Sequence, residues 1–133
     1  MIELHGFITI RETYEVTDEE NIDSVIAEIK KEMQKPEYPK LEIKTMNGEY
    51  YMEFSLFANY LAGDCKKILS FFERVGELAK GSYGLLYLMD DEDCNGNNNT
   101  FKVWRLARGR VNSFEDHLLS PFIPVVEDAW IQE

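Results

Sequence analysis

The sequence predicts an α+β fold in which two helices pack on one face of a mainly antiparallel sheet. Two segments with helical periodicity, near residues 22–35 and 65–80, alternate with segments rich in β-branched and aromatic residues. An Asn-Gly pair at residues 47–48 joins two of the strand-like segments, as is typical of a hairpin. The order β-α-β-β-α-β-β is compatible with a ferredoxin-like core that carries an extra strand. We expect one domain, residues 1–133, because no repeat or linker divides the chain.

The first expected elements are a strand over residues 2–14 and the helix that follows it. Gly6 within the strand predicts a bulge or a close approach of another backbone. Thr17-Asp18-Glu19-Glu20 forms a capping box that would start the helix, and Pro36 ends it near Lys35. The apolar stripe of this helix comprises Ile22, Val25, Ile26, Ile29 and Met33, whereas Asp23, Glu28, Lys30 and Glu32 lie outside it.

The clearest local prediction is a hairpin over residues 40–57. A type I′ turn needs positive φ at both central residues, and Asn47-Gly48 is the pair that adopts it most readily. Folding about this turn places three pairs opposite one another on one face: Thr45 with Tyr50, Ile43 with Met52, and Leu41 with Phe54. The turn and the hydrophobic pattern therefore predict the same register.

The second helix is expected over residues 65–80, with Asp64 as its N-cap. Gly76 would permit a close approach to the sheet, and Gly81 would end the helix in the left-handed conformation. Its core stripe comprises Ile68, Leu69, Phe71, Phe72, Val75, Leu78 and Ala79.

Two strands and an apolar tail complete the predicted fold. The run 82–89 is apolar on both faces, as in a strand covered on both sides, and an acidic, Asn-rich loop leads from it to a strand over residues 100–107. A basic turn at residues 108–110 follows. Each proline of segment 118–126 lacks a ladder donor, so we expect this tail to pack as an extended cover over exposed core or a sheet edge.

The strand 100–107 carries the side chain best suited to a protein interface. Its alternation places Trp104 with Lys102, Leu106 and Arg108 on one face, opposite to Phe101. If the Phe101 face points inward, Trp104 lies on a charged outer surface, where exposed Trp and Arg become interface anchors. The alternative is that the apolar tail covers Trp104.

The charge of the chain favours a basic partner. Asp and Glu number 25 against 14 Lys and Arg, for a formal net charge of −11 and a pI near 4.6. Such a surface repels nucleic acid and anionic membranes, although acidity can also serve solubility alone. No apolar run approaches a membrane span, and no signal peptide is evident. Two cysteines in such a chain favour free thiols in a reducing cytoplasm.

The sequence gives no positive support for catalysis, a metal or a cofactor. Residues 91–96 resemble the first half of a calcium loop, but Lys102 stands where the twelfth position requires a bidentate Glu. We therefore interpret these residues as a hairpin loop rich in turn formers. His5 and His117 lie in no metal-ligand spacing, and neither a phosphate loop nor a hydrolase motif is present.

Short motifs spread along the chain carry a resemblance to a known family. They are His5-Gly6, Ile10-Arg11-Glu12, Gly81-Ser82-Tyr83-Gly84-Leu85-Leu86-Tyr87, Asp91-Glu92-Asp93, Phe101 and Val103, Arg108-Gly109, Asp116, and Leu119-Ser120-Pro121-x-Ile123-Pro124-x-x-Glu127-Asp128. Together they are similar to the immunity protein 7 family of bacterial polymorphic toxin systems. The likeness spans nearly the whole chain, and residues 15–80 match only in their order of helices and strands. Phe7 stands where the family pattern leads us to expect Trp.

The resemblance implies a small cytoplasmic antidote, encoded beside a secreted toxin, that binds and blocks the toxin's C-terminal domain. Such toxins are often nucleases with basic sites, which an acidic protein can occupy through charge complementarity. Charge reversal at Asp91 and Asp93 should then weaken binding. The alternative is a ferredoxin-like module that binds a small ligand or regulates a partner enzyme, and a homo-oligomer through an open sheet edge is compatible with either.

The expected partner-binding residues follow from physical chemistry, since the family supplies no binding map. The first set is Asp90, Asp91, Glu92, Asp93, Trp104 and Arg108. A second set, Asp116, Glu127 and Asp128, could bind the partner or instead tie the tail to the sheet.

Overall fold

The structure is a computed structural model that describes residues 1–13, 21–58, 63–93, 96–127 and 129. Its elements in chain order are β1 (Ile2–Ile10), α1 (Ile22–Met33), β2 (Lys44–Met46), β3 (Glu49–Ala58), α2 (Gly63–Leu78), β4 (Tyr83–Asp90), β5 (Lys102–Ala107), β6 (Arg110–Glu115) and α3 (Phe122–Val125). The predicted capping box at residues 17–20 lies outside the described residues.

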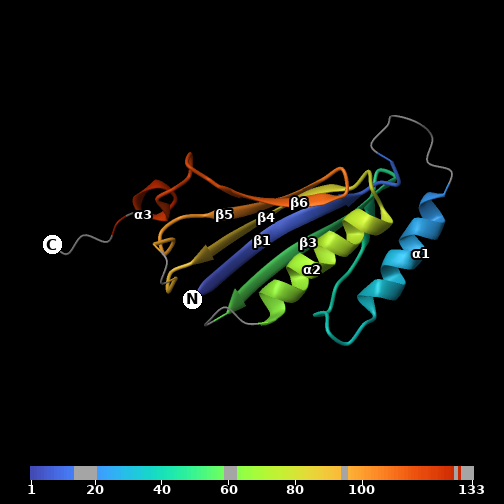
Figure 1. The fold of residues 1–133 in the computed structure, drawn as a ribbon, viewed down its shortest axis with the longest axis horizontal. Helices are drawn as coiled ribbons and strands as arrows, with labels where there is room; N and C mark the ends of the chain where they lie inside the picture. The colour runs from blue at the N-terminus through green and yellow to red at the C-terminus, as the bar shows by residue number, and fades with distance from the viewer. Residues whose placement is uncertain (14–20, 59–62, 94–95, 128, 130–133) are drawn as a thin grey trace.

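The strands form one six-stranded sheet in the order β2-β3-β1-β4-β5-β6 (Figure 1). Every neighbouring pair is antiparallel. Strand β3 lies between β1 and β2, and β1 lies between β3 and β4, so the first four strands and two helices follow the ferredoxin-like split arrangement. This confirms the predicted α+β class, and the predicted order of elements as far as β5.

The structure adds two strands to this core instead of the expected one. Strand β6 pairs with β5 across a tight turn in which Arg108 and Gly109 have φ of 51° and 74°. The sequence pattern did not indicate β6, because most of its residues are polar and exposed. Such a composition suits an edge strand, whose outer side must resist further strand pairing.

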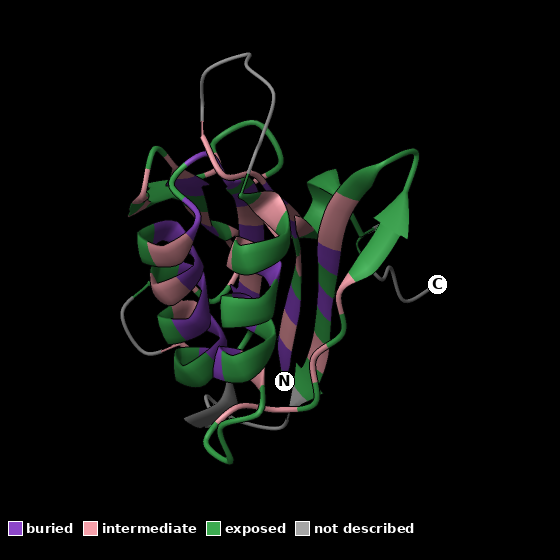
Figure 2. Cartoon of the chain, turned by 90° about the vertical axis from the view of Figure 1, so that its right-hand side faces the viewer, coloured by how far each residue is buried: buried purple, intermediate pink, exposed green. Residues whose placement is uncertain are grey.

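The hydrophobic core lies between α1 and α2 and one face of the sheet (Figure 2). On β1, the side chains of Ile2, Leu4, Ile8 and Ile10 are at most 1% exposed. The helices contribute the predicted stripes, with Phe71 and Phe72 of α2 fully buried. Burying a side chain of this kind stabilises the fold by roughly 1.5–3 kcal/mol. Among the described residues, no helix is long and apolar enough to cross a membrane.

The hairpin between β2 and β3 confirms the predicted turn and the first of the three predicted pairs. Asn47 and Gly48 have φ of 53° and 77°, and Thr45 lies opposite Tyr50. Strand β2 is only three residues long, so Leu41 and Ile43 precede the ladder, and both pack against the core. The local chain therefore decides both the position of this turn and the face that it buries.

Close backbone approach explains three glycines, one of them differently from the prediction. An ideal Cβ on Gly6 would lie 2.4 Å from the Leu85 carbonyl oxygen, and one on Gly76 would lie 2.9 Å from Leu106 Cδ1, as the expected close approaches require. Gly81 is not left-handed. A Cβ there would lie 2.0 Å from the carbonyl oxygen of Thr13, so space, and not φ, requires glycine.

The two helices also differ from the prediction at single polar residues. Glu32 was expected outside the buried stripe, but its residue is 7% exposed and accepts hydrogen bonds from Lys35 and Tyr38. Both partners lie in the segment that follows α1. The periodicity of the helix alone therefore could not predict that Glu32 is buried. Asp64 lies within the first turn of α2, which begins at Gly63, and is therefore not its N-cap.

The C-terminal tail packs on the sheet face opposite the helices, against the start of β5. The ring of Phe122 meets Phe101 edge-on at 5.3 Å, and Phe101 meets Tyr87 of β4 at 5.8 Å. The Asn99 side chain accepts a hydrogen bond from the Ile123 amide and donates one to its carbonyl. The tail covers the sheet as predicted only at Phe122, and it includes the short helix α3. Its other large apolar side chains remain 42–89% exposed: Leu118, Leu119, Ile123, Val125 and Val126.

Candidate functional site

Most of the predicted partner-binding carboxylates lie at one end of the sheet, which we call the acidic end. Asp90 is the last residue of β4, and the loop that starts at Asp91 leads to β5. The start of β1 lies there too, because Ile2 pairs with Asp90. Chain segments far apart in sequence bring their carboxylates to this end: Glu3, Asp90, Asp91, Glu92, Asp93, Asp116 and Glu127.

Hydrogen bonds within the loop hold two of these carboxylates in place. Asp90 Oδ1 accepts the Glu92 amide at 3.0 Å, and Asp93 Oδ2 accepts the Asn97 amide at 3.0 Å. The Thr100 hydroxyl donates to the Asn97 carbonyl oxygen. These are the local side-chain-to-backbone bonds that Asp and Asn form in turns, so the interpretation as a turn-rich loop holds for its described residues.

Asp91 and Glu92 are the most exposed of the loop carboxylates, and the terminal amine of Met1 lies beside them. This ammonium group donates a hydrogen bond to Asp91, and that bond raises the pKa of the amine above its usual value. The negative charges of Asp91, Glu92 and Asp90 act in the same direction. Glu127 lines a neighbouring cleft of about 150 Å³ together with Met1 and Asp91.

Trp104 lies on the helix-bearing face of the sheet, so both alternatives considered for it were wrong. It stands opposite Leu86 of β4, which is 1% exposed, and packs against the core. Leu106, two residues on, is fully buried beneath Gly76 of α2. The Phe101 face therefore points away from the helices, and the tail covers Phe101 and not Trp104.

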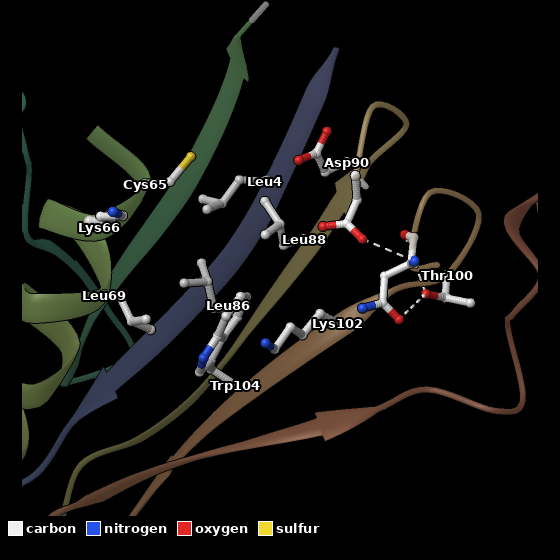
Figure 3. A pocket seen from close by; sticks show the side chains of 12 residues that line it. Leu4, Cys65, Lys66, Leu69, Leu86, Leu88, Asp90, Thr100, Lys102 and Trp104 are labelled. Carbon is white, nitrogen blue, oxygen red and sulfur yellow. Dashed lines mark hydrogen bonds between the residues drawn. The ribbon is translucent and has the colours of Figure 1, made fainter. Parts of the chain in front are cut away.

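Trp104 borders a pocket of about 320 Å³ between α2 and strands β4 and β5 (Figure 3). The pocket joins an apolar floor to charged groups at its rim. Its lining residues are Leu4, Cys65, Lys66, Leu69, Leu86, Leu88, Asp90, Asp93, Asn97, Thr100, Lys102 and Trp104. The ammonium group of Lys102 lies 5.3 Å from the centroid of the Trp104 ring, within the range of a cation–π contact.

The structure thus brings Asp90, Asp93 and Trp104 together around one pocket and separates other candidates from them. Arg108 lies in the turn at the opposite end of β5. Asp116 accepts hydrogen bonds from the Leu118 and Leu119 amides, which ties the start of the tail. Asp128 lies outside the described residues.

Sequence reasoning missed the part of the site that α2 contributes. Cys65, Lys66 and Leu69 lie far from β5 along the chain, and only the packing of helix on sheet places them beside Trp104. One signal in the sequence could have indicated that Trp104 faces the core. Leu106, two residues further on, is apolar and lies on the same face of the strand. Together with Val111, it continues the core toward the sheet edge.

The described residues contain no group of three or more His, Cys, Asp or Glu side chains that could hold a metal ion. This statement covers only part of the loop that resembles a calcium site, because its residues 94–95 lie outside the described ranges. What the described site offers is carboxylates, an apolar pocket and an indole ring, a set suited to binding.

A family model described as Immunity protein 7 matches residues 1–128. Neither a curated protein nor a solved structure matches the chain.

Proposed function

The chain belongs to the immunity protein 7 family, and we propose that it neutralises a cognate nuclease-type toxin domain by covering the toxin's basic site. The family implies an immunity protein of toxin systems. The protein would act without catalysis, in the cytoplasm of the cell that makes the toxin. Its part is to occupy the surface that the toxin uses for nucleic acid.

The gathering of carboxylates at the acidic end is the observation that carries this proposal. A nuclease binds phosphates through Lys and Arg, so its site has the opposite charge. Asp91 and Glu92 are exposed there, with side chains 57% and 68% accessible. Complementary charge would speed the encounter with the toxin domain and disfavour wrong partners.

The adjoining pocket adds what charge alone does not supply. Exposed ion pairs contribute little affinity, whereas apolar anchors buried near the centre of an interface contribute most of it. The pocket beside Trp104 opens next to Asp90 and Asp93, so charge and apolar surface are continuous.

The test is binding to the C-terminal toxin domain encoded beside this chain, measured by calorimetry and by inhibition of nucleic-acid cleavage. The test variant reverses two exposed carboxylates, Asp91→Lys with Glu92→Lys. We prefer this pair to Asp91 with Asp93, because Asp93 also orders the loop through the Asn97 amide. We expect the dissociation constant to rise at least tenfold, with the melting temperature within a few degrees of wild type.

The matched control is Glu28→Lys with Glu73→Lys, which changes the net charge equally at exposed positions of α1 and α2. This control should bind like wild type. Equal weakening in both double variants would mean that total charge alone matters. Unchanged binding in the Asp91 and Glu92 variant would place the interface elsewhere.

A second candidate function is binding of a small ligand, and the pocket beside Trp104 is the observation that favours it. Native mass spectrometry of the protein purified from its host distinguishes the two. A stoichiometric small molecule would favour this second function, whereas a complex with the toxin domain would support the first.

A further inference from the structure

The pocket beside Trp104 has an apolar floor that the described side chains leave unfilled. Leu4, Leu86 and Leu88 form this floor, and Leu69 of α2 stands at one side (Figure 3). The C-terminal half of α2 lies tight on the sheet, where a Cβ on Gly76 would be 3.3 Å from Gly109. The N-terminal half, with Cys65 and Lys66, borders the pocket instead. A cleft of about 320 Å³ therefore remains beside the indole ring.

The rim of the pocket carries both carboxylates and lysines. Asp90 and Asp93 lie toward the acidic end, and their neighbours Asp91 and Glu92 add to the negative potential there. Two lysines also line the pocket: Lys66 of α2, and Lys102, whose ammonium group lies 5.3 Å from the centroid of the Trp104 ring. A cation that approaches from the acidic end meets carboxylates first.

These features identify the chemistry of the group that would fit. Leucine side chains and an indole ring favour an aromatic ring, which gains from both apolar burial and ring contacts. A charge taken to the apolar floor would lose its hydration without a partner, so a basic group belongs at the rim. The volume is at the lower end of the roughly 300–1,000 Å³ of small-molecule sites, which suits one side chain.

We propose that the pocket beside Trp104 receives an aromatic side chain of the partner, whose neighbouring basic residue faces Asp90 and Asp93. This inference rests on the proposed function, since the partner is the toxin domain. In this proposal the pocket binds the central side chain of the interface, and the carboxylates of the acidic end attract the basic partner toward it.

The first experiment uses the model dipeptide acetyl-Phe-Arg-amide and does not depend on the toxin. Titration is followed by NMR in a Trp130→Phe background, which leaves Trp104 as the only tryptophan. We expect saturable shifts of the Trp104 indole and of the methyl groups of Leu69, Leu86 and Leu88. Acetyl-Ala-Arg-amide and acetyl-Phe-Glu-amide should each bind at least fivefold more weakly. Equal binding of the alanine peptide, or absence of saturable shifts at these residues, would overturn the proposal.

A filling variant and a matched control locate the binding. Leu69→Trp places a large side chain in the pocket, whereas Leu85→Trp makes the same change at a half-buried position on the opposite sheet face. The dipeptide shifts should disappear in L69W and persist in L85W. Persistent shifts in a folded L69W protein contradict the proposal.

A milder variant keeps the test decisive if L69W does not fold. Asp90→Asn preserves an oxygen that can accept the Glu92 amide but removes the charge. It should retain binding of the phenylalanine peptides and lose the preference for arginine over glutamate. An unchanged preference would exclude Asp90 as the group that faces the base.

The same variants with the toxin domain separate this proposal from the proposed function. We expect L69W to raise the dissociation constant at least tenfold and L85W to leave it unchanged. If wild type binds the toxin domain and L69W binds equally well, the pocket proposal fails and the proposed function stands. If wild type does not bind, the proposed function fails, and the dipeptide titration decides about the pocket. A copurified small molecule seated in the pocket would overturn the anchor role.

Discussion

Glu32 on α1 accepts a hydrogen bond from the Tyr38 hydroxyl at a distance of 3.0 Å. Lys35 donates to the same carboxylate at 3.1 Å, and the Arg74 guanidinium of α2 lies 3.6 Å away. The carboxylate therefore links α1 to the segment that follows it and to the second helix. A buried charge of this kind is tolerated because it is both paired and hydrogen-bonded.

This arrangement predicts that Glu32 makes the stability of the protein sensitive to acid. Burial raises the pKa of the Glu32 carboxyl, but the hydrogen bonds from Lys35 and Tyr38 and the charges of Lys35 and Arg74 outweigh it, so the pKa in the folded state lies below 4.5. A lowered pKa means that the stabilisation is complete above about pH 4.5 and is lost as the pH falls through the folded-state pKa.

Glu32→Gln should therefore lower the free energy of unfolding by on the order of 1 kcal/mol at pH 7, and by less at pH 3.5. Urea denaturation at the two pH values measures the difference. Glu28→Gln, at an exposed position of α1, is the control and should change neither value. If E32Q lowers the free energy of unfolding equally at both pH values, the charge of the carboxylate plays no part in the stability.

Gly81→Ala should be strongly destabilising, because an ideal Cβ there lies 2.0 Å from a backbone oxygen of Thr13. Overpacking against backbone costs up to about 3 kcal/mol. Gly48→Ala is the comparison, because a Cβ at Gly48 meets nothing within 4 Å. Only the positive φ then lowers the stability of this variant, by about 1 kcal/mol. Thermal and denaturant unfolding of both variants measure the order. A loss of stability in Gly81→Ala no larger than that in Gly48→Ala would contradict the close approach of the Thr13 backbone to Gly81.

Asn99→Ala should release the C-terminal tail without unfolding the sheet. It removes the bonds between the Asn99 side chain and the backbone of Ile123, at 2.9 and 3.0 Å. Hydrogen exchange at the Ile123 amide should become at least tenfold faster, while that of Ile8 in β1 stays unchanged. Asn98→Ala, at an exposed neighbouring position, serves as the control. Unaltered exchange at Ile123 would mean that the remaining contacts hold the tail, among them the Phe122 ring and the hydrogen bond from the Phe122 amide to the Asn99 carbonyl oxygen.

Association with the toxin domain should slow as salt is added. Exposed charges steer the encounter, and their field is screened over about 10 Å at 0.1 M salt. Stopped-flow measurements between 50 and 500 mM NaCl should show at least a tenfold fall in association rate and a much smaller change in dissociation rate. The Asp91→Lys, Glu92→Lys variant should flatten this dependence. An association rate that is independent of salt for wild type would argue against charge-guided binding.

The sequence predicted correctly those features that depend on neighbouring residues. The turn at Asn47-Gly48 and the pairing of Thr45 with Tyr50 follow from local backbone preference and alternation. Gly6 and Gly76 were predicted to permit close approach, because a glycine inside a regular element usually has a packing reason. The helix stripes and the α+β class follow from periodicity in the same way.

Features that depend on residues distant in sequence could not be predicted in this way. The alternation in strand 102–107 defines two faces but not which face α2 covers, so Trp104 was assigned to the wrong side. Glu32 lies outside the apolar stripe of its helix and is buried by Tyr38 and Arg74. Strand β6 was not predicted because most of its residues are polar, as suits a strand at the edge of a sheet.

The sequence by itself determined the class of the fold, the order of its elements from β1 to β5, the turn of the β2–β3 hairpin, and the resemblance to a family whose model covers residues 1–128. These properties reside in periodicity, turn chemistry and motif spacing, which are local. The tertiary structure alone decided that the carboxylates from separate segments meet at one end, and that Asp90, Leu69 and Trp104 border one pocket. The reason is physical: a pocket is formed by the packing of helix against sheet, and no single segment of the chain contains it.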